Sequence, residues 1–146
     1  KYVAVPRIIN GTNDMDFYLL KNAKSGREIG KDFENQFDRG IFGIREPKEC
    51  LKKLSLSDIR KASYDTGCLV LVPALAFERS GARLGRGKGF YDKFLSALKG
   101  SPVISCGVCF NFQILDSVPT ETNDFAVDYI LSEMSLQNTK RIFAAI

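Results

Sequence analysis

The segment that decides the fold runs from Cys68 to Phe110, "CLVLVPALAFERSGARLGRGKGFYDKFLSALKGSPVISCGVCF". Its near-continuous apolar start, residues 68–77, is typical of a central parallel strand buried on both faces, with Pro73 near its carboxyl end. "FYDKFLSALKG" has the spacing of a helix that ends at Gly100, and "VISCGVCF" predicts the next strand. Strand, loop, helix and strand make a βαβ unit. We therefore expect an α/β fold with a mostly parallel open sheet flanked by helices, in a Rossmann-like three-layer arrangement.

The rest of the chain predicts shorter elements around this unit. Strands are expected at 2–6, 15–20 and 128–131, one or two short helices within 48–63, and a closing helix over 135–146. The first strand should end at Pro6. Residues 21–47 are rich in glycine and charge, which predicts an irregular excursion, and Glu46 with Pro47 is interpreted as its end without a catalytic role.

Length and composition favour one packed domain. The chain has 146 residues, of which 45% are hydrophobic and 11% aromatic, and such a composition is typical of a packed core rather than of disorder. No apolar run approaches the roughly 20 residues that cross a bilayer. We expect a single α/β domain over residues 1–146 and a monomer without a membrane partner.

The start of the chain and its charge bear on location and ligands. The chain opens on Lys1 and a strand-like run, so we expect an N-terminal segment to be missing. No signal peptide is visible, which predicts a cytoplasmic protein, or an organellar one whose transit peptide has been removed. The net charge of +4 favours an anionic ligand, but it is too small for a nucleic-acid surface, so no nucleic-acid partner is expected.

The chain contains no histidine. This excludes Ser-His-Asp and Cys-His nucleophilic catalysis and histidine-ligated zinc. Any chemistry must use carboxylates, lysine, arginine, tyrosine, cysteine, backbone dipoles or a hard metal ion. Phosphoryl transfer is compatible with this set, because it depends on positioning and charge stabilisation.

Two of the four cysteines, Cys106 and Cys109, form a C-x-x-C pair within an apolar run. Redox pairs of this spacing lie at a helix N-terminus, whereas this pair lies in a predicted strand, where residues three apart face opposite sides. A structural role for reduced thiols is therefore favoured, and a thiol redox role is the weaker alternative.

The glycine-rich loop between the predicted strand and helix lacks the spacing of a Walker loop or of a dinucleotide fingerprint. Gly85, Gly87 and Gly89 allow positive φ angles and a close backbone approach, so their amides could form an anion nest at the helix N-terminus. Phe90 and Tyr91 would pack against a flat ligand. In the alternative, they pack in the core beneath a basic surface turn.

Charged residues on the loop match a phosphate-bearing ligand. Arg83 and Arg86 carry forked guanidinium groups, and Lys88 adds a mobile charge. Asp92 is an unexpected neighbour for a phosphate unless Mg²⁺ lies between them, since Mg²⁺ binds one or two carboxylates together with phosphate oxygens. In the alternative, Asp92 is only a carboxylate in the first turn of the helix.

The string "RLGRGKGFYDKFL" resembles the signature of the 5-formyltetrahydrofolate cyclo-ligase family, also called 5,10-methenyltetrahydrofolate synthetases. Further segments resemble that family in the same order along residues 1–133: "VAVPR" with "NDMDF", "GIFGIREP", "LVLVPALAF" and "GVCFNFQILDSVPTETNDFAVDYILSE". The resemblance implies an ATP-dependent ligase in which the formyl oxygen of 5-formyltetrahydrofolate takes the γ-phosphoryl group. A folate nitrogen then closes the ring, and 5,10-methenyltetrahydrofolate, ADP and phosphate are released.

The resemblance also assigns functional residues. The positions that match the family's ATP-phosphate loop are Arg83, Leu84, Gly85, Arg86, Gly87, Lys88, Gly89, Phe90 and Tyr91. Among them, Lys88, Arg86 and Arg83 would act in catalysis by stabilising charge on the transferred phosphoryl group.

ATP and Mg²⁺ are the cofactors that the resemblance implies. Asp92 and Asp124 match the family's magnesium-associated carboxylates. In the alternative, Asp124 is only a turn residue in "TETND", and Asp128 is its rival for the metal role. Phe112 and Gln113 either contact the ligand or, for Phe112, pack in the core. The family also has an N-terminal region that contributes to ATP and folate binding, and it has no counterpart here. A second hypothesis is therefore a non-catalytic nucleotide- or RNA-binding module that retains the loop.

Overall fold

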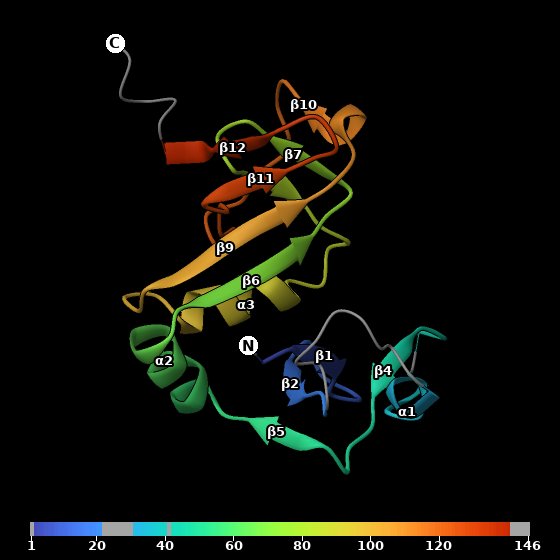
Figure 1. Ribbon diagram of the computed structural model, residues 1–146. Coiled ribbons are helices and arrows are strands. Elements are labelled where there is room, and N and C mark those ends of the chain that lie inside the picture. Colours follow the sequence, from blue (N-terminus) through green and yellow to red (C-terminus); the bar gives the residue numbers. More distant parts are fainter. Residues whose placement is uncertain (1, 22–30, 41, 141–146) are drawn as a thin grey trace. The chain divides into compact units, whose positions relative to one another are not determined.

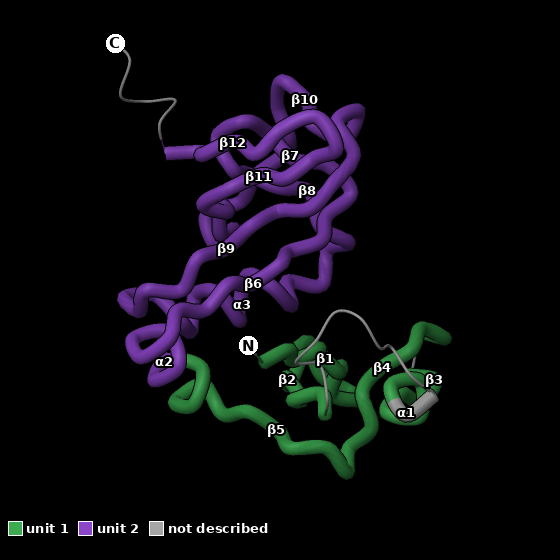
Figure 2. Tube along the Cα trace, viewed as in Figure 1, with its two compact units in different colours: residues 1–59 green, residues 60–146 purple. Residues whose placement is uncertain are grey.

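The computed structural model describes residues 2–21, 31–40 and 42–140, and the chain divides into two compact units (Figure 2). Unit 1 is Lys1–Ile59, and unit 2 is Arg60–Ile146. Helices and small parallel and antiparallel sheets occur together, so the α/β class is confirmed in a mixed form. None of the helices in the described part of the chain has the length and apolar character that crossing a bilayer requires. That the chain forms one domain stays a prediction.

Unit 1 is built on an antiparallel three-stranded sheet in the order β1-β2-β5. The strands are β1 (Ala4–Ile8), β2 (Met15–Leu19) and β5 (Lys52–Leu54). The predicted strand at 15–20 is confirmed, but the predicted end of the first strand is wrong, because β1 continues through Pro6, which lies opposite Phe17. β1 is an edge strand of this sheet, and an edge strand tolerates a residue without an N–H group.

Residues 31–40 and 42–47 form mostly regular structure, contrary to the predicted excursion. The helix α1 (Lys31–Glu34) precedes an antiparallel hairpin of β3 (Phe37–Arg39) and β4 (Arg45–Pro47). Phe33 and Phe37 pack against the buried core of the unit. Burial of these two rings orders a segment whose local sequence carries little periodicity. The rest of the predicted excursion, 22–30 and 41, lies outside the described residues.

Unit 2 contains a four-stranded sheet in the order β12-β11-β9-β6. Its strands are β6 (Cys68–Pro73), β9 (Val103–Val108), β11 (Tyr129–Leu131) and β12 (Leu136–Asn138). The first three are mutually parallel, and β12 is antiparallel to β11. The helix α3 (Phe90–Ala97), which buries Phe94 and Leu95, lies between β6 and β9 in the sequence (Figure 1). The predicted βαβ unit is therefore confirmed.

The predicted strand 68–77 is divided between two sheets. The chain leaves the four-stranded sheet after Pro73, and β7 (Ala76–Glu78) pairs instead with β8 (Arg83–Leu84) and β10 (Ile114–Leu115). The prediction that both faces of β6 are buried is also wrong. Val70 and Val72 are buried, whereas Leu69 and Leu71 are exposed, because one face of this sheet is open among the described residues.

Two predicted helical regions are only partly helical. Within 48–63, the helix α2 (Leu56–Asp65) is confirmed, but β5 forms where a first helix was possible. The prediction of a closing helix is wrong at residues 136–138, which form β12. Pairing with β11 overrides the weak local preference of these residues for a helix. Residues 141–146 lie outside the described residues. The Rossmann-like three-layer arrangement stays a prediction.

Candidate functional site

The glycine loop connects β8 to α3 in unit 2. Gly87 and Gly89 have left-handed φ angles of 75° and 67°, which residues with a side chain rarely adopt. Gly89 directly precedes the first turn of α3, and its carbonyl accepts a hydrogen bond from the Lys93 amide at 3.0 Å. No described side chain caps this end of the helix. The loop therefore brings its backbone to a helix N-terminus whose first amides favour negative charge.

The basic residues of the loop fall into two environments. Arg86 and Lys88 are exposed and free to reach a ligand, whereas the Arg83 side chain is only 5% exposed. Arg83 Nη2 lies 2.6 Å from Asp92 Oδ1, and its guanidinium lies 6.0 Å from the centre of the Tyr91 ring. The structure thus brings Arg83, Tyr91 and Asp92 together, as the sequence predicts for neighbours of one site.

One donor of Arg83 stays unsatisfied despite its burial. Nη2 is paired with Asp92, but among the described residues no acceptor meets the N–H group of Nε. Buried polar groups are almost always hydrogen-bonded, so an open Nε on a buried guanidinium is consistent with a place for an anion. Gly85 leaves the space, since a Cβ there would lie 3.2 Å from Arg83 Nη1.

The other residues of the predicted loop are less buried. Leu84 is exposed and its carbonyl accepts a hydrogen bond from the Leu75 amide at 2.8 Å. Phe90 and Tyr91 are half-buried. Burial raises the pKa of the Tyr91 phenol, and Arg83 opposes the rise. Tyr91 is therefore a neutral phenol at physiological pH and supplies a ring face and a hydroxyl rather than a charge.

Asp92 connects α3 to the turn that contains Asp124. Asp92 Oδ1 accepts a hydrogen bond from the Phe125 amide at 3.0 Å, so the two predicted magnesium carboxylates come from segments in direct contact. Asp124 itself is exposed, and its Oδ2 accepts a hydrogen bond from the Glu121 amide at 2.7 Å. Within the described residues no group of three or more histidine, cysteine or acidic side chains is placed to hold a metal.

Asp128, the alternative to Asp124, is occupied by protein contacts. Its Oδ2 accepts hydrogen bonds from the Ser105 amide at 2.9 Å and the Ser105 hydroxyl at 2.8 Å, and its Oδ1 lies 2.6 Å from Lys140 Nζ. Burial acts to raise the pKa of the Asp128 carboxyl, but the hydrogen bonds from Lys140 and Ser105 outweigh it and lower that pKa. These contacts favour Asp124 over Asp128 as the second metal carboxylate.

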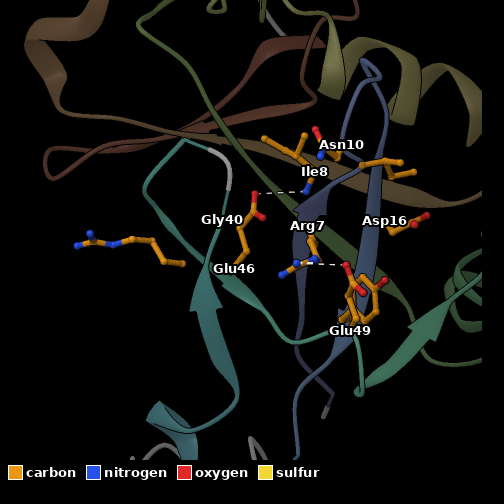
Figure 3. Close-up of a pocket in the computed structure, with 10 residues that line it drawn as sticks. Arg7, Ile8, Asn10, Asp16, Gly40, Glu46 and Glu49 are labelled. Atoms are coloured by element: carbon orange, nitrogen blue, oxygen red, sulfur yellow. Dashed lines mark hydrogen bonds and ion pairs between the residues drawn. The ribbon is translucent and has the colours of Figure 1, made fainter.

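Unit 1 contains a cavity of about 440 Å³ that the sequence did not indicate. Glu46, interpreted above as the end of a loop, is 2% exposed and lines this cavity. Its Oε1 accepts a hydrogen bond from the Ile8 amide at 3.3 Å (Figure 3). A Cβ at Gly40 would overlap the Glu46 carboxylate. The E-P pair of "GIFGIREP" is the only sequence signal for this site, and it carries no sign of burial.

A second acid and a cation line the same cavity as a pair. Arg7 Nη2 lies 3.2 Å from Glu49 Oε1 (Figure 3). Arg7 Nη1 donates a hydrogen bond to the Pro47 carbonyl at 3.0 Å. Arg7 is thereby satisfied by the protein. Glu46 is left as the buried charge of the cavity with one backbone donor, and a carboxylate accepts more than one hydrogen bond.

The cysteines do not support the redox alternative. All four are free thiols, Cys106 is buried and Cys109 is half-buried. Burial raises the pKa of both thiols. The reactive species is the thiolate, and a raised pKa reduces its population at neutral pH.

Comparisons with known proteins agree on one family. The model of the 5-formyltetrahydrofolate cyclo-ligase family matches residues 1–133. The chain is 42% identical over 92 residues to the 5-formyltetrahydrofolate cyclo-ligase of Mycolicibacterium smegmatis, covering 62% of this chain and 43% of that protein. It is 30% identical over 140 residues to the enzyme of that name from Mus musculus, covering 92% of this chain and 62% of that protein.

A solved structure gives the same result. The NMR structure of Aquifex aeolicus 5,10-methenyltetrahydrofolate synthetase matches with a TM-score of 0.67 and 26% identity, over 96% of this chain and 59% of that one. The chain spans about half the length of the curated relatives it matches. From the glycine loop, the family model and these relatives together, the chain belongs to the 5-formyltetrahydrofolate cyclo-ligase family.

Proposed function

We propose that this protein converts 5-formyltetrahydrofolate to 5,10-methenyltetrahydrofolate with hydrolysis of ATP to ADP and phosphate. The observation that carries the proposal is the buried Arg83 guanidinium, whose open Nε lies beside a glycine loop at a helix N-terminus. This arrangement suits an anionic group such as a phosphate. Membership of the cyclo-ligase family supports the reaction.

The chemistry needs a leaving group, and the loop supports its formation. The formyl oxygen forms a bond to the γ-phosphorus of ATP while the bond between that phosphorus and ADP breaks. A folate nitrogen then bonds to the formyl carbon and loses its proton, and the carbon–oxygen bond breaks with release of phosphate. Arg83, Arg86 and Lys88 would stabilise the negative charge on the phosphoryl oxygens, and the loop amides would orient them.

Mg²⁺ would be held by Asp92 and Asp124. The donor set fits a hard cation, because carboxylate oxygens and phosphate oxygens are its preferred ligands, and the Phe125 contact of Asp92 brings the two segments together. When bound, the ion would neutralise part of the negative charge on the phosphate oxygens. Asp92 additionally fixes Arg83 through its ion pair.

The cavity of unit 1 would bind the folate ring. Its volume of about 440 Å³ is within the range of small-molecule pockets. The 2-amino group and adjacent ring N–H of a folate are paired donors that match a carboxylate, and Glu46 is the buried carboxylate there.

The open face of the sheet in unit 2 bears on the predicted layers. Leu69 and Leu71 are exposed on it, and an apolar layer would cover them in a Rossmann-like three-layer arrangement. The expected monomer and cytoplasmic location stay predictions.

The reaction is tested by absorbance at the methenyl-folate band after the protein is mixed with MgATP and 5-formyltetrahydrofolate. We expect a rise that requires both ATP and Mg²⁺. Lys88→Ala should slow it by about 10³-fold, by analogy with arginine fingers, whereas Lys99→Ala, an exposed lysine just after α3, should leave it unchanged. Binding of MgATP without product would favour the alternative, a non-catalytic nucleotide-binding module. RNA binding that weakens steeply as salt rises would favour an RNA-binding module, whereas a MgATP site should respond more to removal of magnesium.

A further inference from the structure

Two phenylalanines of unit 2 form an exposed aromatic pair. The rings of Phe110 and Phe112 are stacked, with centroids 5.7 Å apart and an interplanar angle of 8°. Phe110 is 61% exposed and Phe112 is 78% exposed, so core packing does not account for Phe112. Parallel rings that keep an open face to solvent are suited to stacking with a further flat group.

Side-chain hydrogen bonds hold the turn that carries these rings. Gln113 Oε1 accepts a hydrogen bond from the Phe110 amide at 2.9 Å, and Gln113 Nε2 donates one to the Leu75 carbonyl at 2.9 Å. Glu133 Oε2 accepts a hydrogen bond from the Asn111 amide at 2.8 Å. The turn is therefore fixed on both sides, and the exposed rings are preorganised rather than free to collapse onto the surface.

The pair lies where ligands bind in sheets of this kind. Phe110 follows β9 closely, and β9 is parallel to β6 and β11, so the turn lies at the carboxyl ends of parallel strands (Figure 1). That edge is the usual ligand-binding edge of an open α/β sheet.

The same edge carries the entrance to the glycine loop. The Leu75 carbonyl accepts the hydrogen bond from Gln113, and the Leu75 amide donates to the carbonyl of Leu84, which directly precedes Gly85. One residue thus connects the aromatic turn to the start of the phosphate loop. A ligand with an anionic part on the loop and a flat ring has a stacking partner within the same unit.

We propose that Phe110 and Phe112 form a platform that stacks the planar heteroaromatic ring of a substrate bound at the glycine loop. The proposal rests on the proposed function, and the ring is the adenine of ATP, because the folate ring is assigned to the cavity of unit 1. Phe112 makes the larger contribution because its ring is the more exposed. Gln113 and Glu133 are positioning residues that hold the platform.

The test is calorimetric binding of three probes to the protein and its Phe112→Leu variant: MgATP, magnesium tripolyphosphate, which lacks the base, and 5-formyltetrahydrofolate. If adenine stacks, Phe112→Leu weakens MgATP binding by about tenfold, within the range measured for base stacking, and leaves tripolyphosphate unchanged. Weaker binding of 5-formyltetrahydrofolate alone would overturn the assignment of adenine to the platform. Phe112→Tyr, which keeps the ring, should bind all probes like the wild type.

The controls separate the platform from folding and from the reaction. Tyr64→Leu removes an exposed ring on α2 and should change no dissociation constant, and thermal unfolding of Phe112→Leu should match the wild type. Unchanged affinities in Phe112→Leu beside a wild type that binds would overturn the platform alone. A wild type that binds MgATP and the folate but forms no product would contradict the proposed function alone. No binding by the wild type would overturn both.

Discussion

The glycine loop of unit 2 and the cavity of unit 1 both contain buried charge, but they differ in how the protein neutralises it. At the loop, Arg83 has one ion-pair partner, and its Nε meets no acceptor among the described residues. At the cavity, Arg7 is satisfied by Glu49 and the Pro47 carbonyl, and the carboxylate of Glu46 keeps acceptor capacity. The buried group with open hydrogen-bonding capacity is thus a cation at the loop and a carboxylate at the cavity.

Under the proposed function, this difference would separate the two substrates by chemistry. A site with open cationic donors selects a phosphate, whereas a site with an open carboxylate selects a group rich in N–H donors and disfavours a phosphate. A ligase that joins phosphoryl transfer to a folate needs one site of each kind. Substitutions that act on one site should therefore leave the other substrate's affinity unchanged.

The largest effect is expected at Arg83. Arg83→Lys keeps the positive charge next to Asp92 but removes the fork, so the turnover number should fall by about 100-fold, as when one charge-stabilising donor is removed. The KM for 5-formyltetrahydrofolate should change little. Steady-state kinetics with each substrate varied in turn checks this, with Arg79→Lys as an exposed control. An equal rise in the KM of both substrates would mean that the two sites are not separate.

A smaller effect is expected at Glu46. Glu46→Gln preserves the shape but removes the charge, so the KM for 5-formyltetrahydrofolate should rise by about tenfold, the value of one charged hydrogen bond, while the KM for ATP stays the same. Glu34→Gln is the matched control, since Glu34 is exposed, is paired with Arg45 and does not line the cavity. A changed ATP KM in Glu46→Gln would contradict the assignment of the cavity to the folate.

The smallest effect is expected at Asp128, where the charge is satisfied by the protein. Asp128→Asn should lower the free energy of unfolding at neutral pH by about 1 kcal/mol through loss of charged hydrogen bonds, and it should leave the magnesium dependence of the reaction unchanged. Because folding lowers the pKa of this carboxyl from its ordinary 3.8, its contribution is present above that value. It is lost as pH falls through the lowered pKa of the folded state.

Unfolding by urea at several pH values measures this contribution. The wild type should lose stability at acid pH more steeply than Asp128→Asn, and Asp116→Asn, an exposed control, should follow the wild type. A higher magnesium requirement in Asp128→Asn would instead make Asp128 a metal ligand.

The parts of the molecule that were predicted correctly are those with a local signal. The βαβ unit follows from an apolar run, a helical period and a second apolar run, and the glycine loop follows from three alternate glycines among cations. The strand through Pro6 and the strand at 136–138 were missed, because edge pairing and strand pairing depend on partners elsewhere in the chain. The cavity was missed for the same reason, since its residues span positions 7–49.

Family membership could be determined from the sequence alone. The phosphate-binding character of the loop is predicted from the sequence, because the loop residues are contiguous and their chemistry is set by residue type. The tertiary structure decided which charged side chains are buried and which are already paired within the protein. Arg83 and Glu46 look like surface residues in the sequence, yet both are buried, and Asp128 is occupied by Ser105 and Lys140. The reason is physical: burial and hydrogen bonding depend on segments distant in sequence, and these contacts determine whether a charge is available to a ligand.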